Sequence, residues 1–200
     1  MRDITEVVSR LRARLETPER APVLAEILAK KQRLPPRHAA VLVALFERDA
    51  QAHMLFIRRA STLRSHSGEI AFPGGSIDAI DASPVMAALR EAQEEVGLHP
   101  PLVEVLGVLP PVFTQVSNFL ITPVVACLPQ GLGTLQAQAS EVAEIILASL
   151  HGLADPLIVH TEEWMRDGEP HTIYFYDYGS YRIWGATARI LNALLELLVP

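Results

Sequence analysis

The sequence predicts an α/β fold in which helices cover both faces of a mixed β-sheet. Apolar, strand-like segments alternate along the chain with segments of helical periodicity, which is the pattern of this class. Half of the 200 residues are hydrophobic. A chain of this length buries roughly 70% of its unfolded surface, which suits a single decorated domain. We see no internal repeat and no low-complexity segment.

The chain is expected to begin with two helices. Residues 4–16 and 22–33 carry apolar side chains at helical spacing, and a proline pair then ends this segment. We therefore predict an N-terminal helical extension at residues 1–36 and a main domain at residues 37–200.

The main domain contains runs of two kinds. Short apolar or alternating runs bounded by turn residues indicate strands, and apolar residues three and four apart indicate helices. We expect strands at 39–46, 53–59, 102–109, 119–128 and 172–178, and helices at 84–96 and 186–198.

The helix at 84–96 has clear signals at both ends. Ser83 is a good N-cap, Pro84 suits the first helical position, and Gly97 supplies the left-handed residue that commonly ends a helix. An apolar stripe should pack on the core, so the charged residues of the helix should face a cleft. The stripe consists of Val85, Ala88, Leu89, Ala92 and Val96.

Three glutamates of this helix form one acidic cluster. Glu91, Glu94 and Glu95 lie three or four residues apart or side by side, and Arg90 can pair with Glu94. Carboxylate oxygens clustered in this way suit Mg²⁺ or Mn²⁺ and, through the metal, a diphosphate. A solvated acidic face is the alternative. It explains the pattern less well, because Glu91 and Glu95 repel each other across one turn.

Residues 74–98 resemble the signature of the Nudix hydrolases. That signature has a glycine, an acidic residue and then Arg-Glu-apolar-x-Glu-Glu-x-Gly-apolar. The early acidic position here is Asp81 instead of glutamate, and one extra residue precedes the arginine, so Asp81 is expected to cap or brace a loop. The matching residues are Gly75, Asp81, Arg90, Glu91, Ala92, Glu94, Glu95, Gly97 and Leu98.

The preceding segment resembles the motif found upstream of this signature in the coenzyme A diphosphatases of the Nudix family. That motif combines spaced arginines with a Phe-Pro-Gly-Gly turn. Phe56, Ile57 and Ala60 depart from it, whereas the longer spacing before the arginine and the early aspartate are features of the subgroup. The matching residues are Leu55, Arg59, Arg64, Gly68, Phe72, Pro73, Gly74 and Gly75.

Coenzyme A carries a diphosphate and a 3′-phosphate, so a site for it needs fixed positive charge. Guanidinium groups bind phosphate through two parallel hydrogen bonds, and we therefore expect Arg59 and Arg64 to contact phosphate. Replacing Arg59 should mainly affect substrates that bear the 3′-phosphate. Arg58 lies outside the motif and is expected to form an ordinary ion pair at a strand end.

The resemblance implies metal-dependent hydrolysis of coenzyme A or a derivative to 4′-phosphopantetheine, or its acyl form, and adenosine 3′,5′-diphosphate. Glu91 and Glu95, helped by the carbonyl of Gly75, would hold Mg²⁺ or Mn²⁺, which offsets charge on the leaving phosphate. Glu94 is the first candidate for general base, with Arg90 fixing its carboxylate. The resemblance also implies an α/β/α sandwich, with the N-terminal helices as an added element.

One further carboxylate is a candidate. The segment Ser-Glu-Val-Ala-Glu-Ile at 140–145 is expected to lie between strands, where Nudix enzymes often place an additional glutamate on a mobile loop. Glu144 could join the metal shell or act as base. Alternatively, Glu141 begins a helix and Glu144 is solvated.

Two other functions remain open. A Nudix diphosphatase could act on another nucleoside diphosphate derivative or on a nucleotide, such as NADH, ADP-ribose or a nucleoside triphosphate. A catalytically silent Nudix fold could instead bind a ligand or a protein, although such a binder has no need of the full cluster of Arg90, Glu91, Glu94 and Glu95.

The composition restricts partners and location. Seventeen basic and 23 acidic residues give a net charge of −6 without a long basic block, which argues against nucleic-acid binding. The single cysteine, Cys127, lies in an apolar run, and neither a signal-peptide core nor a membrane-spanning run is present. We expect a cytoplasmic enzyme with a small-molecule substrate and no membrane partner. The apolar C-terminal helix could form a homodimer interface.

Overall fold

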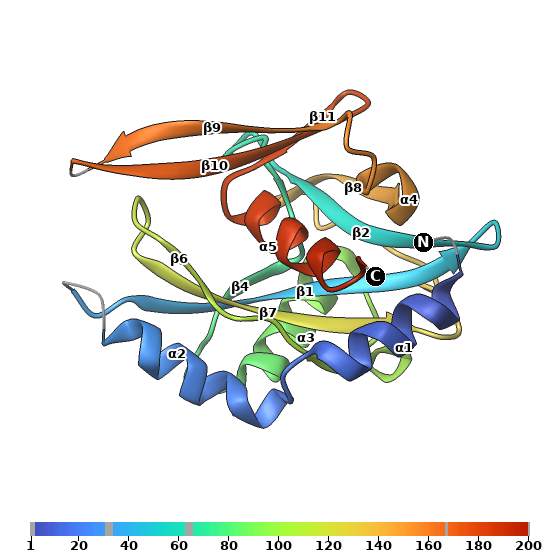
Figure 1. Cartoon of the computed structure of the whole chain (residues 1–200). Coiled ribbons are helices and arrows are strands. Elements are labelled where there is room, and N and C mark those ends of the chain that lie inside the picture. Colours follow the sequence, from blue (N-terminus) through green and yellow to red (C-terminus); the bar gives the residue numbers. More distant parts are fainter. Residues whose placement is uncertain (1–2, 31–33, 63–65, 167, 200) are drawn as a thin grey trace.

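The larger of two β-sheets runs through the middle of the molecule (Figure 1). The computed structural model describes residues 3–30, 34–62, 66–166 and 168–199. The large sheet has the central order β3-β2-β1-β7-β5, with β4 beside β1, β6 beside β7 and β8 beside β2. Its strands are β1 (Arg37–Arg48), β2 (Gln51–Arg59), β3 (Ile70–Ala71), β4 (Gly74–Ser76), β5 (Glu104–Val108), β6 (Val112–Thr114), β7 (Phe119–Leu128) and β8 (Val142–Ser149).

The large sheet is mixed because β1 and β7 are parallel, whereas its other pairs are antiparallel. A smaller antiparallel sheet has the order β11-β10-β9. Its strands are β9 (Val159–Arg166), β10 (Glu169–Tyr178) and β11 (Tyr181–Trp184).

Helices pack on both faces of the large sheet, as predicted. In Figure 1, α3 and α2 lie on one side of the sheet, and α5 lies on the other, beneath the small sheet. The helices are α1 (Ile4–Arg14), α2 (Ala21–Ala29), α3 (Pro84–Val96), α4 (Leu150–Leu153) and α5 (Gly185–Glu196), with short 3₁₀ turns at Pro18–Arg20 and Pro100–Leu102.

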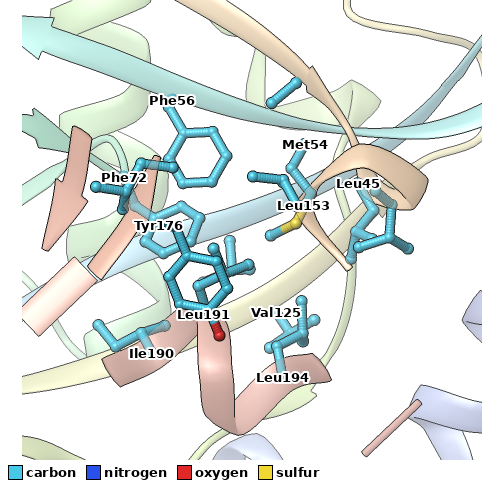
Figure 2. Packing of buried hydrophobic residues seen from close by; sticks show 14 of the residues in the cluster. Leu45, Met54, Phe56, Phe72, Val125, Leu153, Tyr176, Ile190, Leu191 and Leu194 are labelled. Carbon is cyan, nitrogen blue, oxygen red and sulfur yellow. The ribbon is translucent and has the colours of Figure 1, made fainter. Parts of the chain in front are cut away.

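Each face has its own apolar core. Side chains of α3 pack with Leu42 and Val124 of the sheet on one face. On the other face, Leu191 and Tyr176 pack with Phe56, as Figure 2 shows. Val7 of α1 belongs to this second core, so the N-terminal helix is packed against the main sheet. The domain boundary at residue 36 stays a prediction.

The predicted elements are found, with two kinds of difference. The helix at 84–96 and the strand at 119–128 have the expected limits, and Cys127 is buried. The second helix ends at Ala29, and residues 31–33 of the expected range lie outside the described residues. The strands β3, β4, β6, β8, β9 and β11 were not predicted. Residues 140–145 were expected to lie between strands, but Glu144 lies within β8, paired with β2. None of the helices among the described residues is long and apolar enough to cross a membrane.

Candidate active site

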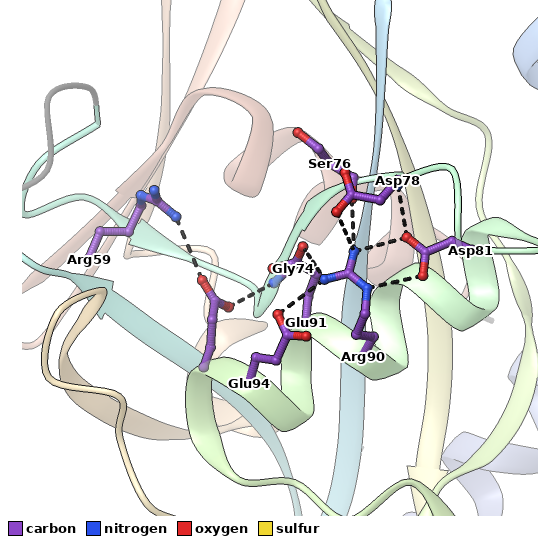
Figure 3. Close-up of polar contacts among 9 residues, drawn as sticks. Arg59, Gly74, Ser76, Asp78, Asp81, Arg90, Glu91 and Glu94 are labelled. Atoms are coloured by element: carbon purple, nitrogen blue, oxygen red, sulfur yellow. Dashed lines mark hydrogen bonds and ion pairs between the residues drawn. The ribbon is translucent and has the colours of Figure 1, made fainter.

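Helix α3 carries the acidic cluster, and both of its caps form as the sequence predicts. The Ser83 hydroxyl accepts a hydrogen bond from the backbone N–H of Met86, and Gly97 adopts the left-handed conformation with φ of 69°. The buried residues Ala88 and Ala92 hold the helix against the sheet. Its polar edge consequently faces β4 and the end of β2, as Figure 3 shows.

Glu95 is the most buried member of the cluster, with 2% of its surface exposed. The backbone N–H of Gly74 donates to its Oε2 at 2.9 Å, and Nη1 of Arg59 lies 3.8 Å from its Oε1. Burial raises the pKa of Glu95 to about 7, although both contacts oppose that shift. The upstream segment and the helix therefore meet at one carboxylate.

Glu91 lies beside the backbone of Gly75. A methyl group at Gly75 would be 2.5 Å from Cδ of Glu91 and 2.6 Å from each carboxylate oxygen. Burial also raises the pKa of Glu91, and Arg90 offsets part of this shift. Glycine is thus required at position 75 because a side chain would occupy the space of the Glu91 carboxylate.

Arg90 links the loop after β4 to the helix. Its Nε and Nη2 donate to Asp81 at 3.0 and 2.9 Å, and Nη2 also donates to the carbonyl of Ser76 at 3.2 Å. Its Nη1 donates to Glu91 at 2.9 Å and to Glu94 at 3.1 Å. The paired guanidinium lowers the pKa of Asp81. Asp81 also accepts a hydrogen bond from a loop N–H, which agrees with the bracing role expected from the sequence.

Glu94 differs from its neighbours in exposure. Its side chain is 60% exposed, and the predicted pairing with Arg90 across one helical turn is confirmed. One carboxylate oxygen is therefore fixed, while the side chain as a whole remains accessible to water and to a substrate.

The cluster fits a divalent metal ion by its chemistry. Glu91 and Glu95 are neighbouring carboxylates with raised pKa values, and a bound cation would offset both their desolvation and their mutual repulsion. The described residues hold no preformed group of three metal-ligating side chains. Mg²⁺ commonly keeps several waters and takes substrate phosphates as ligands, so two carboxylates and a carbonyl suffice.

Glu144 is engaged away from the cluster. Arg58 donates to its Oε2, and the hydroxyl of Tyr181 donates to its Oε1 at 2.7 Å. The ion pair expected for Arg58 is thereby confirmed. Glu141 lies nearer the cluster: its charge contributes to raising the pKa of Glu91 and Glu95. Its backbone carbonyl accepts from the N–H of Ala60, next to Arg59.

Sequence reasoning missed several backbone groups of the site. The N–H of Gly74 and the carbonyl of Ser76 contact charged side chains, and backbone groups carry no signal in residue type. Arg64, expected to contact phosphate, lies outside the described residues.

The fold and this site define a Nudix hydrolase, and comparison with known proteins agrees. The model of the NUDIX domain matches residues 36–168. The chain therefore belongs to the Nudix hydrolase family, whose members act on nucleoside diphosphate derivatives and generally use divalent metal ions.

Two named relatives show how much of the chain is shared. "Uncharacterized Nudix hydrolase NudL" of Enterobacter sp. (strain 638) is 42% identical over 158 residues, which are 79% of this chain and 81% of the relative. The protein of the same name from Cronobacter sakazakii is 43% identical over 166 residues, 80% and 82% of the two chains.

Solved structures show the same fold. The Nudix hydrolase RenU of M. smegmatis is similar with a TM-score of 0.50 and 25% identity over 60% of this chain and 74% of its own. A MutT/nudix family protein of Enterococcus faecalis is similar with a TM-score of 0.51 and 20% identity over 88% and 69%.

Proposed function

We propose that this Nudix hydrolase cleaves the diphosphate of coenzyme A or a coenzyme A derivative. The products would be 4′-phosphopantetheine, or its acyl form, and adenosine 3′,5′-diphosphate. The observation that carries the proposal is the meeting of two motifs at Glu95. Arg59 and Gly74 belong to the segment that resembles coenzyme A diphosphatases, and both contact this glutamate of the Nudix signature.

Glu91 and Glu95, with the carbonyl of Gly75, would hold Mg²⁺ or Mn²⁺. Such an ion offsets charge that develops on the diphosphate and its leaving group. Gly75 brings its backbone close to Glu91, and the N–H of Gly74 keeps one oxygen of Glu95 in place. These contacts hold both carboxylates ready before substrate binds.

Glu94 is our candidate for the base that accepts the proton of the attacking water. Its exposure allows contact with that water, and its hydrogen bond to Arg90 orients the carboxylate. Arg90 then acts as a positioning residue. For a further carboxylate from a neighbouring segment we favour Glu141 over Glu144, because both oxygens of Glu144 are already engaged by Arg58 and Tyr181.

Arg59 would contact the substrate diphosphate. Its guanidinium lies 3.8 Å from Glu95, next to the expected metal ligands, and its Nε is buried without a hydrogen-bond partner among the described residues. An unpaired buried donor is costly, and a phosphate oxygen could pair with it. This placement favours the diphosphate over the 3′-phosphate that the sequence suggested for Arg59.

A substrate panel tests the proposal. Purified protein with Mg²⁺ or Mn²⁺ is offered coenzyme A, acetyl-coenzyme A, dephospho-coenzyme A, NADH, ADP-ribose and nucleoside triphosphates, and products are identified by mass spectrometry. We expect the highest kcat/KM with coenzyme A or its thioester. Faster cleavage of NADH, ADP-ribose or a triphosphate would assign another Nudix activity. Metal binding without cleavage of any compound would favour a binding protein.

A further inference from the structure

A recess lies between the edges of the two sheets, outside the acidic cluster. Its volume is about 290 Å³. Strand β3 is at one edge of the large sheet, and β11 is at one edge of the small sheet. Arg58 and Ile70 line the recess from the large sheet, and Tyr181, Arg182 and Trp184 line it from the small one. Segments far apart in the sequence thus build a single site.

Trp184 gives the recess an aromatic wall. Its ring is parallel to that of Phe175 within 4°, with centroids 6.3 Å apart, and Trp164 packs against it at 6.1 Å. These neighbours hold the indole in one orientation, which lowers the entropy cost of stacking a ligand ring on it. Edge strands also present backbone N–H and C=O groups that can pair with the rim of a base. The wall therefore suits a nucleobase.

Arg182 supplies positive charge at the same wall. Its side chain is 63% exposed, and Asp177 accepts hydrogen bonds from its Nε at 2.8 Å and its Nη2 at 3.4 Å. No described residue accepts a hydrogen bond from its Nη1. A guanidinium held on one side and open on the other can bind a phosphate oxygen.

Two short segments connect the recess to the acidic cluster. Arg58 lines the recess, and the next residue, Arg59, lies beside Glu95. Ile70 lines the recess, and Gly74, which donates to Glu95, follows four residues later. Four extended residues span at most about 13 Å. The side chains of Arg58 and Arg59 point to opposite sides of β2, so the recess and the cluster lie on either side of the end of this strand. In a nucleoside diphosphate one ribose separates the base from the diphosphate, and such a molecule would reach both places by passing the strand end.

We propose that this recess binds the nucleoside end of the substrate, with the base stacked on Trp184 and the ribose phosphate at Arg182. The identity of that end as 3′-phosphoadenosine rests on the proposed function. The location itself rests on the recess and its two connections to the cluster. The pantetheine end would then leave the cluster in another direction.

Binding of the two halves of the substrate tests the proposal without turnover. Trp184→Leu and the control Trp164→Phe are titrated by calorimetry with adenosine 3′,5′-diphosphate and with 4′-phosphopantetheine. Loss of a stacking ring should weaken the nucleotide about tenfold in Trp184→Leu and leave phosphopantetheine within twofold. Trp164→Phe keeps an aromatic ring beside Trp184 and should bind both like the parent, because Trp164 does not line the recess. Unchanged nucleotide affinity in Trp184→Leu, or a selective loss of phosphopantetheine, would overturn the proposal.

A second measurement keeps the recess intact. The chain has two tryptophans, so Trp164→Phe leaves Trp184 as the only indole. Adenosine 3′,5′-diphosphate should quench its fluorescence in a saturable manner, whereas phosphopantetheine should not. Binding without any change in fluorescence would contradict stacking on Trp184. If coenzyme A is not cleaved, the proposed function fails, but quenching by AMP or ADP-ribose still tests the recess.

Discussion

Replacement of Gly75 by alanine should impair catalysis without unfolding the protein. The added methyl group would lie 2.5 Å from Cδ of Glu91, and carbon atoms in favourable contact are about 3.5–4.0 Å apart, so the carboxylate must move by about 1 Å. A displacement of 1 Å at a reacting centre can cost about 100-fold in rate. We therefore expect kcat/KM for the best substrate of the panel to fall about 100-fold, and Mn²⁺ binding measured by calorimetry to weaken.

Stability should respond differently to the same change. The backbone of Gly75 is outside the left-handed region, so alanine fits it and removes freedom from the unfolded chain, which contributes about 0.4–1 kcal/mol of stability. This gain offsets part of the local clash. We expect the free energy of unfolding in urea to change by less than about 1 kcal/mol.

A double-mutant cycle decides whether Gly75→Ala acts through Glu91. In a Glu91→Gln background an amide has already replaced the carboxylate, so adding Gly75→Ala should lower kcat/KM much less than it does in the parent. Additive losses in the two backgrounds would refute the reasoning. So would kcat/KM of Gly75→Ala within threefold of the parent.

Four further substitutions test other contacts of the site. Glu95→Gln should lower kcat by several orders of magnitude with an unchanged circular dichroism spectrum. Near-normal turnover would show that Glu95 is not an essential metal ligand. Since burial raises the pKa of Glu95 from 4.5 to about 7, the folded chain keeps a proton that the unfolded chain releases between these values. The free energy of unfolding of the metal-free protein should consequently fall by up to about 3 kcal/mol as the pH rises through this window, and Glu95→Gln or added Mg²⁺ should flatten the urea-derived profile. Arg90→Ala leaves the carboxylate of Asp81, whose side chain is 3% exposed, without its ion-pair partner and should destabilise the fold by about 2–3 kcal/mol. The side chain of Glu94 is 60% exposed, so Glu94→Gln should change the free energy of unfolding by less than about 0.5 kcal/mol. Equal effects of the two substitutions would contradict these contacts. Arg59→Ala should lower kcat/KM for coenzyme A and dephospho-coenzyme A by the same factor. A loss confined to coenzyme A would indicate that Arg59 contacts the 3′-phosphate.

Helix α3 could be predicted to the residue because its signals are local. Ser83 and Gly97 mark its ends by side-chain chemistry and backbone conformation that depend only on neighbours in sequence. The pairing of Arg90 with Glu94 is likewise set by one helical turn. Such features do not require knowledge of the tertiary structure.

The contacts of Glu144 could not be predicted in this way. Its partners are 86 and 37 residues away, and they meet only because β2, β8 and β11 come together. The strand that carries Glu144 does have a local signal, because residues 145–148 form an apolar run, but this signal does not indicate which side chains Glu144 meets. The contact of Arg59 with Glu95 is non-local for the same reason.

The five hydrogen bonds of Arg90 give this residue a structural role that is separate from its proposed part in catalysis. They join the loop after β4 to α3 and neutralise Asp81, so the fold needs Arg90 whether or not a reaction takes place. Glu94 has no comparable share in holding the loop. We therefore expect that a related protein without catalytic activity would lose Glu94 before Arg90 and Asp81. In relatives of this protein, we therefore expect the arginine to indicate a shared architecture and the glutamates to indicate the proposed chemistry.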